Sequence, residues 1–60
     1  MTFTEWRKDT LMMTKRELAL ALGVSPALIT MIEHGNAKIS TKMRGNIKKL
    51  YGTAIAKELV

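Results

Sequence analysis

The segment TKRELALALGVSPALITMIEHG, residues 14–35, decides the fold. Thr14 is a favourable N-cap, and Glu17 three residues later completes a capping box, so a helix is predicted to begin at Lys15. Apolar residues follow at helical spacing, and Gly23 stands where a left-handed residue is expected after a helix. The sequence therefore predicts a first helix of about two turns that ends at Gly23.

A second helix is predicted directly after the first. Ser25 is a favourable N-cap, and Pro26 suits the first helical position because its missing N–H group costs nothing there. Ile29 and Ile32 mark an inward face, and Gly35 supplies the next C-cap. The turn between the two helices is too short for an antiparallel hairpin and favours a steep crossing. This arrangement is typical of a helix-turn-helix.

Together these residues resemble the helix-turn-helix of the Cro and phage-repressor superfamily, also called the XRE family. The residues that carry the resemblance are Thr14, Arg16, Glu17, Leu18, Ala19, Leu22, Gly23, Val24, Ser25, Ile29, Thr30, Ile32, Glu33 and Gly35. The resemblance implies an all-α, compact bundle of about five short helices with the lambda-repressor-like DNA-binding fold. Residues 1–60 are then expected to form a single domain.

Length and composition narrow the class of protein. Sixty residues make one small domain, and such a domain buries only about 60% of the surface that its unfolded chain exposes. There is no cysteine, hence no disulfide framework, and no apolar run approaches the roughly 20 residues of a membrane span. We expect a soluble protein of the bacterial cytoplasm or nucleoid, with no membrane partner.

The charge of the chain favours a polyanionic partner. Ten Lys and Arg residues stand against five Asp and Glu residues, a formal net charge of +5. After Glu33 the only acid is Glu58, whereas the basic residues are Lys38, Lys42, Arg44, Lys48, Lys49 and Lys57. An isolated lysine is usually only a solvated side chain. Beside a helix-turn-helix, the same excess indicates a phosphate-binding surface.

Phe3 and Trp6 stand three residues apart on one face of a predicted N-terminal helix, so both are expected to anchor the core. In the family, a basic residue follows the position of Trp6, pairs with the acid at the position of Glu33 and contacts phosphate. The resemblance implies Arg7 for this role, with Lys8 as the alternative.

This N-terminal helix is predicted to end at about Met12. The segment between Arg7 and Met13 is one residue longer than the family's usual spacing, by the resemblance. Either the pair Asp9 and Thr10 or the pair Met12 and Met13 absorbs the extra residue.

Two more helices are predicted after the central pair. Ser40 caps a helix that runs to about Tyr51, and a shorter one follows Gly52, from Thr53 to Leu59. The apolar face of the longer helix consists of Ile39, Met43, Ile47, Leu50 and Tyr51. The terminal segment is too short to be stable alone, so it either completes the core of this subunit or contacts a second subunit.

By the resemblance, the helix from residue 26 to residue 34 lies in the major groove of double-stranded DNA. Its base-reading positions are Pro26, Ala27, Thr30 and Met31. Ala and Met mainly touch the thymine methyl group, whereas Thr does so or hydrogen-bonds, so direct readout is expected to be modest. Specificity then comes either from methyl contacts together with DNA shape or from further residues such as His34, Asn36 and Lys38.

Phosphate contacts are predicted on both sides of that helix, because cationic side chains and helix N-termini attract anions. The predicted phosphate or flanking contacts are Arg7, Lys15, His34, Asn36, Lys38, Thr41, Lys42 and Arg44. Lys15 stands where relatives often place a Gln that touches phosphate. Lys48 and Lys49 are weaker candidates, and His34 fits a solvent-exposed residue without a role equally well.

The predicted function is a sequence-specific, DNA-binding transcriptional regulator. The short chain resembles Cro-type repressors of phages and mobile elements, which implies a homodimer on a pseudo-palindromic operator with half-sites about 34 Å apart. No cofactor, metal site or small-molecule ligand is expected. An enzyme is disfavoured because the chain has no cysteine nucleophile, no Gly-rich phosphate loop and a single histidine.

The alternative function is a protein-interaction module, antitoxin-like or anti-repressor-like, on the same fold. Pro26, Ala27 and Met31 would suit an apolar contact, since Met is adaptable and enriched at interfaces. The basic residues after Glu33 argue against this alternative.

Overall fold

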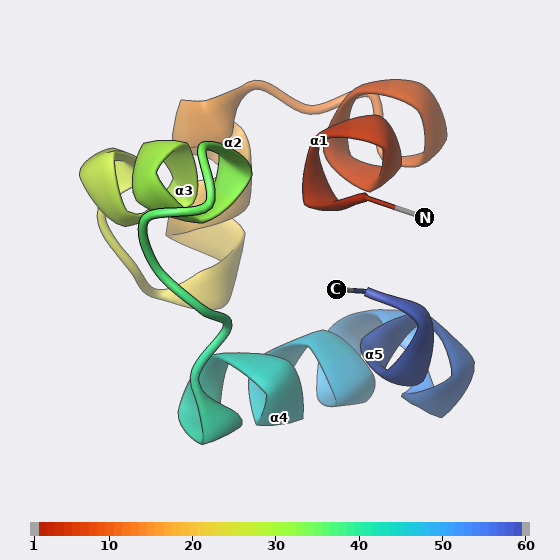
Figure 1. The fold of residues 1–60 in the computed structure, drawn as a ribbon. Coiled ribbons are helices and arrows are strands. Elements are labelled where there is room, and N and C mark those ends of the chain that lie inside the picture. Colours follow the sequence, from red (N-terminus) through yellow and green to blue (C-terminus); the bar gives the residue numbers. More distant parts are fainter. Residues whose placement is uncertain (1, 60) are drawn as a thin grey trace.

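The computed structural model describes residues 2–59, and these form a bundle of short helices (Figure 1). The helices are α1 (Phe3–Glu5), η1 (Trp6–Thr10), α2 (Lys15–Leu22), α3 (Pro26–Glu33), α4 (Thr41–Tyr51) and α5 (Thr53–Glu58). In Figure 1, α3 lies across α2, and α4 leads away from this pair to α5. The predicted all-α fold with a central helix-turn-helix is confirmed.

Local capping sets the bounds of the central helices as predicted. The Glu17 N–H group donates to Thr14 Oγ1 (3.1 Å), and the Thr14 N–H group donates to Glu17 Oε1 (2.9 Å). Helix α2 ends at Gly23, which has a left-handed φ of 70°. Helix α3 starts at Pro26 after Ser25, whose side chain accepts the Leu28 N–H group. Only three residues separate the two helices, so α3 must change direction sharply against α2.

The N-terminal helix departs from the prediction. After one α-helical turn it continues as the π-helix η1, in which the Leu11 N–H group donates to the Trp6 carbonyl at 2.9 Å. Each such bond spans five residues instead of four, so a π-helical turn takes up one extra residue. The expectation of a continuous helix to about Met12 was wrong, because η1 ends at Thr10. Both candidate pairs for the extra residue lie in irregular backbone: Asp9 and Thr10 belong to η1, whereas Met12 has a left-handed φ of 53° and the Met13 N–H group donates to the Arg7 carbonyl at 3.1 Å.

Trp6 lies at the centre of the core, with 1% of its surface exposed. Its ring meets those of Phe3 and Tyr51 edge to face, at centroid distances of 5.5 and 5.2 Å. The buried apolar residues are Phe3, Trp6, Leu18, Ala19, Leu22, Ile29, Ile32, Met43, Ile47, Ala56 and Leu59. Because Ala56 and Leu59 are among them, α5 and the residue after it complete the core of this subunit.

The apolar face of α4 is narrower than predicted. Met43 and Ile47 are buried, but Leu50 is 55% exposed. The contact of α4 with the last residue of α2 is made one turn before Leu50, where the Asn46 amide donates to the Leu22 carbonyl at 3.2 Å. Leu50 is therefore not part of the packed face, although Tyr51 beside it packs on Trp6.

Candidate nucleic-acid interface

One side of α3 is open to solvent. Ile29 and Ile32 face the core, whereas Ala27 and Met31 are exposed on the opposite side and Pro26 is exposed at the start of the helix. With 3.6 residues per turn, residues three or four positions apart share a face of a helix, so the buried and the exposed residues of α3 fall on different faces. Thr30, the fourth predicted base-reading residue, is half-buried at the edge of this surface. We call the exposed side of α3, with Pro26, Ala27, Thr30 and Met31, the reading face.

A buried ion pair fixes the end of α3. The Arg7 guanidinium donates from Nε to Glu33 Oε2 (2.6 Å) and from Nη2 to Glu33 Oε1 (3.2 Å). Nη1 of the same guanidinium donates to the Met13 carbonyl at 2.9 Å. The two charged side chains are 9% and 5% exposed. The structure thus shows for Arg7 the pairing that the resemblance implied, while Lys8 is exposed; a phosphate contact by Arg7 stays a prediction.

The ion pair keeps Glu33 charged. Burial alone would raise the pKa of this carboxyl group, but the hydrogen bonds and positive charge of Arg7 oppose it. The positive charge of Lys15 and a hydrogen bond from Thr4 act in the same direction as Arg7. The net result is a pKa of Glu33 below its usual value of 4.5.

The free energy of unfolding is expected to fall as the pH is lowered below 4.5, toward the depressed pKa of folded Glu33. In that window the unfolded carboxyl group binds a proton that the folded one does not, so acid favours the unfolded chain. Urea titrations monitored by circular dichroism from neutral pH into this window measure the effect. The double variant Arg7→Met with Glu33→Leu, which has no titrating group at position 33 and leaves no unpaired buried charge, should show a flatter dependence on pH. Equal pH dependence in the two proteins would contradict this role of Glu33.

Cationic and polar side chains stand at the starts of α2 and α4, the helices before and after α3. At the start of α2, Lys15 Nζ donates to Thr30 Oγ1 at 3.3 Å. At the start of α4, Thr41 and Lys42 are exposed in the first turn after the N-cap Ser40. A cation near a helix N-terminus opposes the helix dipole, so helix stability does not explain the position of Lys42. Both the lysine and the helix end attract anions, so a phosphate contact of Lys42 stays a prediction. His34 and Asn36, at the end of α3, are also exposed.

The structure engages Arg44 in hydrogen bonds within the protein, so its predicted phosphate contact stays a prediction without support from the geometry. Its Nη1 donates to the main-chain carbonyls of Ala56 and Leu59, at the end of α5. The last carbonyl groups of a helix have no partner within the helix, and a guanidinium satisfies them well. Arg44 therefore joins α4 to α5, and we leave it out of the proposed DNA contacts.

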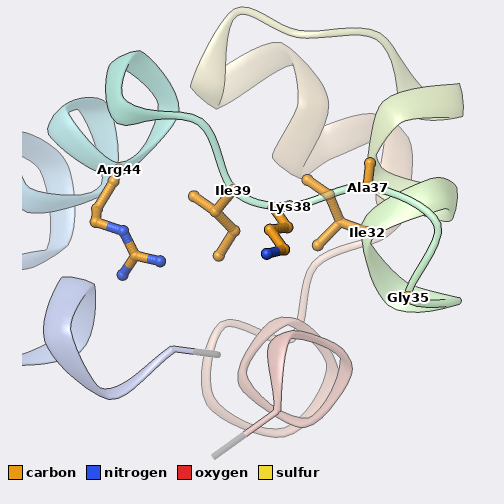
Figure 2. A pocket seen from close by; sticks show the side chains of 6 residues that line it. All are labelled: Ile32, Gly35, Ala37, Lys38, Ile39 and Arg44. Carbon is orange, nitrogen blue, oxygen red and sulfur yellow. The ribbon is translucent and has the colours of Figure 1, made fainter.

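Lys38 lies beside a pocket of about 360 Å³ that the loop after α3 forms with α4 (Figure 2). The lining residues are Ile32, Gly35, Ala37, Lys38, Ile39 and Arg44. Because the side chain of Ile32 faces the core side of α3, this pocket is not on the reading face. Lys38 is exposed, but in this arrangement it is a weaker candidate than Lys15 or Lys42 for a contact near the reading face.

A family model described as helix-turn-helix matches residues 4–56 of the chain. The chain belongs to the XRE-type helix-turn-helix family. This XRE-type protein is therefore a DNA-binding regulator. No curated protein and no solved structure matches it.

One cation of this XRE-type domain was not assigned from the sequence. Arg16 is exposed in the first turn of α2 and, with Leu20, Val24 and Pro26, lines a shallow pocket of about 310 Å³. It therefore lies near the start of α3, beside the reading face. The clue in the sequence was a second basic residue directly after Lys15, at a helix start that already attracts anions.

Two structural findings concern other kinds of site in the XRE-type domain. Across residues 2–59, no helix has the length and apolar character needed to cross a membrane. The same residues bring together no group of three or more acidic or histidine side chains that could hold a metal ion.

Proposed function

We propose that this protein is a sequence-specific transcriptional regulator, most simply a Cro-like repressor that acts by occupying its operator. The observation that carries the proposal is the exposed reading face of α3, together with an exposed or half-exposed lysine in the first turn of the helix before it, Lys15, and of the helix after it, Lys42. A surface of this kind suits a helix in the major groove with a phosphate backbone on either side.

In the proposed complex, α3 enters the major groove and α2 crosses the backbone. Ala27 and Met31 would contact thymine methyl groups, and Thr30 would hydrogen-bond to a base edge. Lys15, Asn36, Thr41 and Lys42 would bind phosphate groups. Since the reading face holds few hydrogen-bonding groups, the sequence-dependent shape of DNA would supply much of the remaining specificity.

A homodimer is part of the proposal, because one small module covers only about 600–1,000 Å². The Cα atoms of the described residues extend over 24 × 23 × 20 Å. Two such domains in contact place their centres about 30 Å apart, if their facing helices pack at about 8–10 Å between axes. This separation is close to one helical turn of DNA, about 34 Å, so two reading faces would meet consecutive major grooves. A pseudo-palindromic operator and repression of a phage or mobile-element promoter are the simplest expectation.

Selection of bound duplexes from a random library by the purified protein tests this function. We expect an inverted repeat with half-site centres about one helical turn apart. If each subunit neutralises about four phosphates, log K plotted against log salt for the selected duplex should have a slope near −7. Steep salt dependence without any enriched sequence would reduce the protein to a non-specific DNA binder. A slope near zero, or no binding at low salt, would contradict the proposal and favour the protein-interaction alternative.

A further inference from the structure

The hydroxyl group of Thr30 is the one hydrogen-bonding side chain among the four residues of the reading face. A threonine hydroxyl has one hydrogen to donate and two lone pairs that accept, so by itself it bonds equally to donors and acceptors of a base. In this structure Lys15 Nζ lies 3.3 Å from Thr30 Oγ1. An ammonium group only donates, so it uses a lone pair of that oxygen, and the hydroxyl hydrogen must point away from it.

Lys15 is held at this position by its surroundings. It is half-buried at the start of α2, and the negative charge of Glu33 lies within electrostatic reach of it. Glu33 follows Thr30 by almost one helical turn and is itself fixed by Arg7. The ammonium of Lys15 thus lies beside Thr30 and is attracted by Glu33 at the same time.

The proton of the Thr30 hydroxyl is available to a ligand. Among the side-chain hydrogen bonds of residues 2–59, Thr30 Oγ1 takes part only as the acceptor from Lys15. An amino group that approached this oxygen would place a second positively polarised N–H group beside the ammonium, which is electrostatically unfavourable. A base acceptor meets no such opposition and is attracted by the same charge.

We propose that Lys15 sets the hydrogen-bonding polarity of Thr30, so that position 30 reads an acceptor on a base edge. The accepted groups are purine N7, guanine O6 and thymine O4, and the rejected ones are the amino groups of adenine and cytosine. The inference rests on the proposed function and adds a specificity-determining pair to it. Lys15 is the positioning residue and Thr30 the residue that touches the base.

The test compares the wild type with Lys15→Met, Thr30→Val and the double variant, each after library selection. The base pair whose preference Thr30→Val weakens is then replaced by each of the other three, and its preferred purine by the 7-deaza analogue. We expect the preferred base to present an acceptor, and Thr30→Val to reduce discrimination there by about 3- to 10-fold, the effect of one neutral hydrogen bond. Lys15→Met should reduce discrimination at the same base pair, and the double variant should lose no more of it than Thr30→Val alone.

Two matched variants distinguish an effect on the direction of the Thr30 hydrogen bond from the general attraction of a cation to DNA. Thr30→Ser keeps the hydroxyl group and should keep the preference. Lys42→Met removes one cation from the start of α4 and should weaken binding to all sequences equally. Circular dichroism shows that each variant is folded, and Thr30→Ala replaces Thr30→Val if the latter is not.

Three results would overturn the inference while the proposed function stands, because in each the wild type still selects an operator. In the first, Lys15→Met loses the same affinity for all four base pairs at that position. In the second, the preferred base presents only an amino group. In the third, Thr30→Val keeps the preference of the wild type. A wild type that selects no sequence would overturn the proposed function, and this inference with it.

Discussion

Reversing the charges of Lys15 and Lys42 together is expected to abolish operator binding, with a loss of affinity of more than about 100-fold at physiological salt. The two lysines lie in the first turns of α2 and α4, the helices before and after α3. In a dimer, Lys15→Glu with Lys42→Glu replaces four attractive phosphate contacts by four repulsive ones. Because the slope follows the number of phosphates neutralised by cations, the loss of these four cationic contacts would also reduce the magnitude of the log-log salt slope by about 4. Fluorescence anisotropy of a labelled operator, titrated at several salt concentrations, measures both quantities.

A control of equal net charge is provided by Lys49→Glu with Lys57→Glu. Both lysines are exposed, and Lys49 lies about 10 Å along the axis of α4 from Lys42. This variant should keep most of the affinity and most of the salt slope. Equal losses in the two variants would mean that overall charge, rather than contacts at the starts of α2 and α4, drives binding.

The same pair of variants separates DNA binding from the protein-interaction alternative. A protein partner held by the apolar Ala27 and Met31 would still bind after Lys15 and Lys42 are reversed. A partner complex lost together with DNA binding would instead show that both ligands use the charged surface.

Replacing Glu33 by alanine is expected to destabilise the fold by about 3–5 kcal/mol, because it leaves the buried guanidinium of Arg7 without its counter-charge. A domain of this size rarely has more than about 3–5 kcal/mol of stability from its core. The Glu33→Ala protein should therefore be largely unfolded at 25 °C. Urea and thermal titrations monitored by circular dichroism give the free energy of unfolding of the two proteins.

The double variant Arg7→Met with Glu33→Leu tests whether the unpaired charge of Arg7 causes the loss of stability. It removes both charges and fills the site with apolar atoms, so it should be more stable than Glu33→Ala alone. A double variant less stable than Glu33→Ala would mean that the unpaired charge of Arg7 is not the main cause of the loss. The attraction between Arg7 and Glu33 would then contribute the larger part of the free energy of unfolding. A loss of less than about 1 kcal/mol in Glu33→Ala would show that Arg7 finds water or another partner when Glu33 is absent.

The parts of the fold that were predicted correctly depend on residues close together in sequence. Thr14 and Glu17 form their capping box within four residues, and Ser25 with Pro26 starts α3 in the same way. The η1 segment was not predicted, since nothing local to it distinguishes a π-helix from an α-helix. Its geometry satisfies distant requirements, with Trp6 on the Tyr51 ring and Arg7 on Glu33.

The parts of the candidate site that were predicted correctly also depend on residues close together in sequence. The exposed positions of α3 follow from its helical period and from the resemblance, so Ala27 and Met31 were correctly expected at the surface. The partners of Arg44 are main-chain carbonyls 12 and 15 residues away, and carbonyl groups leave no pattern in a sequence. The contact of Lys15 with Thr30 likewise joins two helices and becomes visible only in the folded chain.

The π-helical segment η1 gives the chain a place where its length can vary in evolution. A bond that spans five residues becomes an ordinary α-helical bond when one residue is deleted, and the path of the main chain is nearly preserved. A homologous protein with one residue fewer between Arg7 and Met13 would then keep both ends of this segment in place. A deletion of one residue within η1 would thus leave the register of α2 and α3 unchanged.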